Sequence, residues 1–172
     1  MTAKIALIAS AALLAGSLAF AADGPTDPQI AHIAYTAGSL DIEAGKLALR
    51  KSKNASVREF ASEMVRDHAA VNERALALVT KLGVTPEPNA TSEGLTKQAD
   101  EARAKLAKLN GKAFDRAYVA NEVAYHNTVN GALKTALIPS ADNGELKSLL
   151  ETGLTLFSEH QKHAEHLSAS LK

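Results

Sequence analysis

Three histidines and one glutamate interrupt rows of small and apolar residues that recur at helical spacing. His68, His126 and His160 each take one place in such a row, and Glu43 takes a place in a fourth row. Burying an unpaired imidazole or carboxylate costs on the order of several kcal/mol of folding free energy, so each of these groups needs a partner. Three imidazoles and a carboxylate form a ligand set that suits Zn, Cu, Ni or Fe better than Ca or Mg. The four residues are therefore candidate metal ligands.

Three further residues lie within one helical turn of these candidates. Glu122 precedes His126 by four positions, and Met64 precedes His68 by four. A thioether at position 64 would favour copper, although core filling explains a buried methionine equally directly. His163 follows His160 by three positions, where it could join a ligand set or simply face solvent.

Sequence patterns of known catalytic sites are missing. A ferritin-type di-iron centre needs a Glu-x-x-His motif on two helices, and the chain contains no such motif. The chain also lacks Gly-x-Ser-x-Gly, a P-loop and His-Glu-x-x-His. With no cysteine, it has no thiol nucleophile and no thiolate ligand. We therefore assign no catalytic residue and no organic cofactor, and we do not favour an enzyme.

Caps and periodicity predict five helices and no strand. The expected ranges are 27–51, 56–82, 92–109, 112–137 and 142 to near the end of the chain. Four of these helices are long, and the shorter third one lies inside the connection between the second and the fourth. The sequence thus predicts an all-α, ferritin-like four-helix bundle with a long crossover that contains a short extra helix.

The candidate ligands fall at one level of this bundle. In the crossover topology the first and last long helices run parallel, and so do the other two. Counted from the helix ends, Glu43, His68, His126 and His160 then lie within about one turn of the same height. This coincidence is the strongest functional signal in the sequence.

The first 21 residues are typical of a cleaved bacterial signal peptide. Lys4 precedes an apolar stretch rich in Ala and Leu, and Ala19-Phe20-Ala21 offers small residues for a signal peptidase. Residues 22–172 would then form one periplasmic or secreted domain, with no membrane span after cleavage. The chain has 19 basic and 19 acidic residues, and loss of Lys4 leaves one net negative charge. Such a balance gives no field that would attract nucleic acid.

Several motifs resemble one bacterial family. They are Leu40-Asp41-Ile42-Glu43-Ala44-Gly45, then Phe60-Ala61-Ser62-Glu63-Met64-Val65-Arg66-Asp67-His68, then Phe114-Asp115-Arg116-Ala117-Tyr118, and finally His126 and His160. Together they resemble a family of exported proteins of unknown function with a ferritin-like bundle, often given the label outer membrane protein. The resemblance covers about residues 27–170 and implies a fold rather than an activity. Glu122 departs from the pattern, so a role for it would be particular to this chain.

The sequence is compatible with two functions. In the first, the bundle binds a transition metal through Glu43, His68, His126 and His160, for storage, buffering or sensing. In the second, it is a structural or interaction protein of the cell envelope, connected with stress, whose polar layer only fixes the helix register. The sequence identifies neither the metal nor a protein partner nor the oligomeric state.

Overall fold

Six α-helices and one π-helical segment make up the part of the chain that the structure describes. The computed structural model describes residues 24–171, and no strand occurs within them. The elements are α1 (Asp27–Lys51), α2 (Ala55–Leu82), α3 (Ala90–Ala107), α4 (Gly111–Ala132), the π-helical segment η1 (Leu133–Leu137), α5 (Ile138–Ser140) and α6 (Gly144–Ser170). The prediction of an all-α fold is confirmed. The predicted signal peptide, residues 1–21, lies outside the described residues.

Side-chain caps fix where the helices begin. Thr26 forms a capping box with Gln29 at the start of α1, and Asn143 accepts hydrogen bonds from two backbone N–H groups at the start of α6. The helix α2 begins after Asn54, whose side chain accepts a hydrogen bond from the N–H of Val57. The predicted start at residue 56 was therefore late, because an asparagine supplies this cap two residues earlier.

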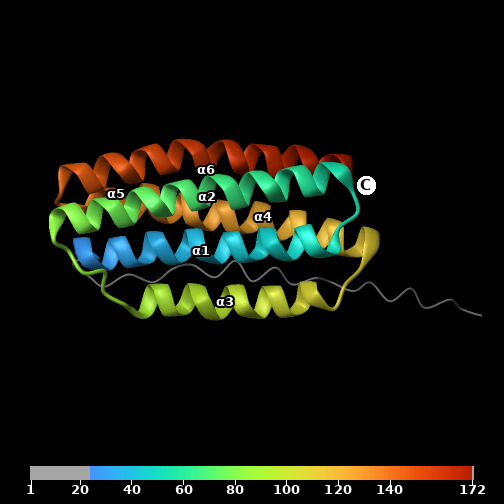
Figure 1. Ribbon diagram of the computed structural model, residues 1–172, viewed down its shortest axis with the longest axis horizontal. Helices are drawn as coiled ribbons and strands as arrows, with labels where there is room; N and C mark the ends of the chain where they lie inside the picture. The colour runs from blue at the N-terminus through green and yellow to red at the C-terminus, as the bar shows by residue number, and fades with distance from the viewer. Residues whose placement is uncertain (1–23, 172) are drawn as a thin grey trace, which may run out of the picture.

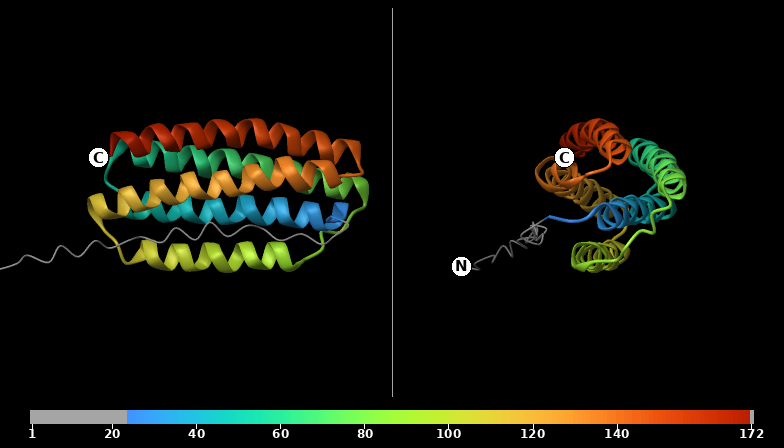
Figure 2. Two further views of the ribbon diagram at one scale, coloured as in Figure 1. Left: turned by 180° about the vertical axis from the view of Figure 1, so that it is seen from behind. Right: turned by 90° about the vertical axis from the view of Figure 1, so that its left-hand side faces the viewer.

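The four long helices form two antiparallel hairpins, and α3 connects them (Figure 1). One hairpin is α1 with α2, and the other is α4 with α6. The helix α3 runs back along the outside of α1 (Figure 2). As a result α1 runs parallel to α6, and α2 runs parallel to α4. The predicted crossover with its extra helix is confirmed. No helix in residues 24–171 has the length and apolarity needed to cross a membrane.

The end of the fourth long helix differs from the prediction. Pro139 was expected to break the helix, yet the chain continues through η1 and α5 as far as Ser140. A proline ring inside a regular α-helix collides with the carbonyl four residues earlier. The wider π-helical turn at Leu133–Leu137 ends two residues before the proline, and a widened turn is one way to relieve such a collision.

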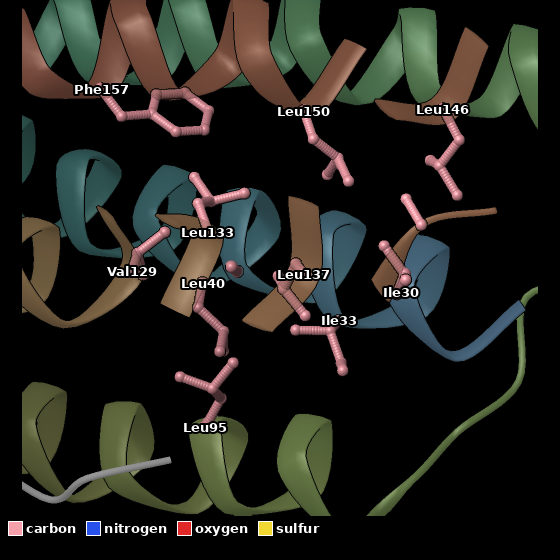
Figure 3. Close-up of a cluster of buried hydrophobic side chains, with 12 residues drawn as sticks. Ile30, Ile33, Leu40, Leu95, Val129, Leu133, Leu137, Leu146, Leu150 and Phe157 are labelled. Atoms are coloured by element: carbon pink, nitrogen blue, oxygen red, sulfur yellow. The ribbon is translucent and has the colours of Figure 1, made fainter. Parts of the chain in front are cut away.

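The apolar core is divided in two along the bundle axis. The first apolar cluster, shown in Figure 3, comprises Ile30, Ile33, Ala37, Leu40, Leu95, Val129, Leu133, Leu137, Ala141, Leu146, Leu150 and Phe157. The second comprises Ala44, Ala48, Val57, Phe60, Ala61, Met64, Leu106, Phe114, Tyr118, Val119, Ala164 and Leu167. On α1, α4 and α6, buried polar residues lie between members of the two clusters, and on α2 His68 lies between the second cluster and Val71, which packs against the first. These residues form the polar layer: Asp41, His68, Glu122, His126 and His160.

Glycines bring α1 close to α2 on either side of the polar layer. A Cβ atom on Gly45 would lie 2.9 Å from Val65 Cγ2 and 3.1 Å from the backbone oxygen of Ala61. A Cβ atom on Gly38 would collide with the side chain of Asn72. These two positions, one turn before and one turn after Asp41, therefore let the backbones of α1 and α2 approach each other at the level of the site.

Candidate metal centre

The first helix contributes Asp41, not Glu43, to the polar layer. The Asp41 side chain is fully buried, whereas the Glu43 side chain is 50% exposed and forms an ion pair with Lys46 at 3.0 Å. The expected placement of Glu43 was wrong because alanine and glycine make up six of the ten buried residues of α1. Alanine gives a weak hydrophobic signal, so the sequence pattern pointed to a register two residues too late.

The three predicted histidines come together from three helices. His68 on α2, His126 on α4 and His160 on α6 are each at most 3% exposed. Their ring centroids are 5.7 Å apart for His68–His126, 5.4 Å for His68–His160 and 5.6 Å for His126–His160. Around a tetrahedral Zn²⁺ with Zn–N distances of about 2.1 Å, the centroids of two bound imidazoles lie roughly 5.2 Å apart. The three rings thus already have nearly the spacing that one shared ion requires.

Hydrogen bonds to a backbone oxygen and to an outer carboxylate orient two of these rings. Nδ1 of His126 lies 3.0 Å from the backbone oxygen of Glu122, and Nε2 of His160 lies 3.1 Å from Oδ2 of Asp67. If these nitrogens carry the protons, the lone pairs of His126 Nε2 and His160 Nδ1 remain available. Both of those nitrogens are buried without a hydrogen-bond partner. Such outer contacts fix the tautomer of histidines in known metal sites.

His68 and Asp41 complete the group. The His68 ring stacks on Phe157 with centroids 4.5 Å apart and planes at 10°. Its Nε2 lies 2.6 Å from Asp41 Oδ2, which in turn is 3.8 Å from His126 Nε2. In spite of the short distance, neither His68 Nε2 nor either Asp41 oxygen has a partner with hydrogen-bond geometry. Ligand atoms of the three histidines lie within 4.8 Å of one another, and Asp41 on α1 approaches two of these histidines, His68 and His126.

Glu122 lies beside this group, next to Asp41 and His126. It is fully buried, its Oε2 has no hydrogen-bond partner, and Asn121 Nδ2 is 3.5 Å from Oε1. Ligand atoms of Asp41, Glu122 and His126 all lie within 4.8 Å of one another. Burial and the nearby Asp41 charge raise the pKa of Glu122 well above its usual range. A neutral Glu122 can donate a hydrogen bond to a charged Asp41.

Burial lowers the pKa of two imidazoles of the site. It lowers the pKa of His126 to about 4, and it also lowers the pKa of His160. Burial alone would raise the pKa of Asp41, but the attraction of His68 and His126 outweighs it and holds that pKa below its usual range. One carboxylate and neutral imidazoles are the protonation states in which these groups bind metals.

The other two candidate ligands lie outside this group. Met64 is fully buried and belongs to the second apolar cluster, where it packs beside Gly45. His163 is 44% exposed, forms an ion pair with Glu63 at 2.8 Å and places its ring edge against Phe60. Asp67 forms an ion pair with Arg66 at 2.6 Å, and its Oδ2 also lies 3.1 Å from Nε2 of His160.

Comparisons with known proteins point to a family and a fold. The profile of a domain of unknown function, DUF4142, matches residues 15–167 of this chain. No curated protein matches the chain. A crystal structure from Streptomyces coelicolor, provisionally described as the secreted protein DUF305, is similar in fold with a TM-score of 0.71 and 14% sequence identity. The similarity covers 88% of this chain and 96% of that one. At this identity it shows the shared fold alone.

Proposed function

Because the chain belongs to the DUF4142 family, whose description names no activity, we infer its function from the site. We propose that the bundle binds one transition-metal ion through Asp41, His68, His126 and His160. In this proposal the protein acts outside the cytoplasm, in the periplasm or secreted, as a store, buffer or sensor of the metal. The secreted description of the Streptomyces coelicolor protein supports an exported location.

The observation that carries this proposal is the incomplete hydrogen bonding of the polar layer, in which the main polar contact is the 2.6 Å approach of His68 Nε2 to Asp41 Oδ2. Asp41 Oδ1 and Oδ2, His68 Nδ1 and Nε2, His126 Nε2 and His160 Nδ1 are all buried without a hydrogen-bond partner. Leaving one buried polar group unpaired costs about 1–3 kcal/mol, and more for a charged one. A layer that served only to fix helix register would be expected to satisfy its own hydrogen bonds. A bound cation would take one of these atoms from each of the four residues.

The kinds of donor atom narrow the choice of metal. Three nitrogens and one carboxylate oxygen suit Zn²⁺, Cu²⁺, Ni²⁺ or Fe²⁺, and Met64 supplies no sulfur ligand because it packs in the apolar cluster. Four protein ligands would fill a tetrahedral shell. Catalytic zinc sites keep one position for water or substrate. A filled, buried shell therefore favours retention of the ion over catalysis.

The proposal can be tested by titrating the metal-free protein with Zn²⁺, Cu²⁺, Ni²⁺, Fe²⁺ and Co²⁺. We expect one tight equivalent, with the intense visible absorption of tetrahedral coordination in the Co²⁺ form. Asp41→Asn should weaken binding strongly. Glu43→Gln makes the same chemical change two residues away on the exposed face and should bind as the wild type does.

The alternative function makes the opposite prediction. If the polar layer only fixes helix register, none of the five ions will bind tightly and none will raise the melting temperature of the wild type. That result would leave a structural or interaction role in the cell envelope as the better account of the protein.

A further inference from the structure

The proposed centre is enclosed, so an ion must reach it through the surrounding helices. Asp41, His68, His126 and His160 are all at most 3% exposed. On the α2–α6 side, however, the centre adjoins a second group of potential ligands that reaches the surface. This outer cluster consists of Glu63 and Asp67 on α2 and His160 and His163 on α6.

We propose that the outer cluster is a second metal site, which captures a hydrated divalent transition-metal ion and passes it to the buried centre. This inference rests on the proposed function. Ligand atoms of Glu63, Asp67 and His160 all lie within 4.8 Å of one another. Two carboxylates with imidazole nitrogen are ligands that suit Zn²⁺ and its neighbours in the first transition series.

Exposure rises in steps from the centre to the surface. The exposed fraction is 1% for the His160 side chain, 16% for Asp67, 30% for Glu63 and 44% for His163. The residues are spaced by four on α2 and by three on α6, so each pair lies on one face of its helix. Nδ1 of His163 is 2.8 Å from Glu63 Oε2, which places the outermost imidazole beside the outermost carboxylate. An ion in water can therefore meet this cluster before it meets the centre.

His160 belongs to both sites through its two different nitrogens. Nε2 is 3.1 Å from Asp67 Oδ2 in the outer cluster, whereas Nδ1 is buried without a partner at the centre. For an ion to bind at Nε2, the ring proton that lies between this nitrogen and Asp67 moves to Nδ1, so the imidazole stays neutral. The ion displaces the guanidinium of Arg66, which lies 2.6 Å from Asp67 Oδ1 and is largely exposed. Capture at the outer cluster thus exchanges weak surface contacts for metal–ligand bonds.

The rate of metal uptake tests this proposal. Stopped-flow mixing of the metal-free mature protein with Co²⁺ would follow the tetrahedral absorption of the buried centre. The test variant is Glu63→Gln with His163→Gln. The matched control is Glu59→Gln with His166→Gln, which makes the same chemical changes at exposed positions on the same two helices. Circular dichroism verifies that both variants fold.

We expect the rate at which the test variant fills the buried centre to fall by at least about tenfold. The wild-type cluster of negative charge raises the local concentration of cations, and the test variant removes part of that charge. Its final affinity at the centre should match the wild type, and the control should match the wild type in both. An unchanged uptake rate in the test variant overturns the outer site. Failure of the wild type to bind any ion would instead refute the proposed function, so the two failures can be told apart.

Discussion

His68 and His160 occupy similar places in their helices but depend on different neighbours. His68 faces Asp41, a fully buried carboxylate that lies 2.6 Å away. The partner of His160 is Asp67, which is partly exposed and also pairs with Arg66. Loss of His68 would strand a buried charge, whereas loss of His160 would not. Substitution of these two histidines should therefore have different effects on the metal-free protein.

We expect His160→Leu to leave the melting temperature of the metal-free protein unchanged or higher, because leucine replaces an unsatisfied buried nitrogen with apolar volume. The same variant should lose the stabilisation by Zn²⁺, which is about 2.7 kcal/mol for the wild type at a hundredfold excess over the dissociation constant. His68→Leu should instead destabilise the metal-free protein by about 3–5 kcal/mol. Thermal melting with EDTA and with Zn²⁺ measures both effects. Equal behaviour of the two variants would contradict this assignment.

Glu122 should make the stability of the metal-free protein depend on pH. Its pKa is raised in the folded state, so folded Glu122 keeps a proton that the unfolded chain loses above about pH 4.5. This contribution to stability is complete at low pH and is lost as the pH rises, by at most about 1.4 kcal/mol per pH unit. Glu122→Gln removes the ionisation but keeps the shape.

The variant Glu122→Gln should therefore gain stability relative to the wild type as the pH rises from 5 to 8. Urea unfolding in EDTA at several pH values measures the difference. Glu151→Gln, which makes the same chemical change at an exposed position of α6, serves as the control. A constant difference between Glu122→Gln and the wild type would show that Glu122 is ionised in both states.

At the scale of the elements, the close approach of α1 and α2 holds Asp41 against His68. Gly45→Ala places a methyl group 2.9 Å from Val65 and 3.1 Å from a backbone oxygen of α2. Overpacking of this kind costs about 1–3 kcal/mol. Because the two helices must move apart, the variant should also bind metal more weakly. Chemical denaturation and metal titration measure the two effects.

Gly94→Ala is the matched control for this substitution. It lies inside α3, where an added Cβ would have no atom within 4 Å. Replacing a glycine by alanine in an open helical position stabilises by about 0.5–1 kcal/mol. The two glycine variants should therefore shift stability in opposite directions. A stabilised Gly45→Ala variant would show that the α1–α2 spacing is not set at this residue.

Helix periodicity identified three of the four proposed ligands, the histidines, and missed the fourth, Asp41. In α2, α4 and α6 the histidines stand in rows that contain Val, Leu, Met or Phe, so the buried face was unambiguous. In α1 the buried face is largely alanine and glycine, because α2 packs close to it. Small residues carry almost no periodic signal, and so the periodicity of this helix pointed to Glu43 instead of Asp41. The outer contact of Asp67 with His160 joins residues 93 positions apart, which no local pattern could reveal.

At the scale of the whole molecule, the chain should be an exported protein that loses its first residues. We expect the mature protein to begin at Ala22 or Asp23, because Ala19-Phe20-Ala21 offers a cleavage site for a signal peptidase. Mass spectrometry of the protein recovered from the periplasmic fraction or culture medium measures the mature N-terminus. Recovery of a chain that retains Met1 would contradict this prediction.

The four proposed ligands come from four helices, and the last of them, His160, lies in the final helix of the chain. During synthesis, therefore, a partial chain that lacks α6 cannot assemble the full set of ligands. Under the proposed function, the ion would bind at the full set of ligands only after all four helices have docked. The metal that the protein carries would be decided by the compartment in which folding finishes, and by the free metals present there at that moment.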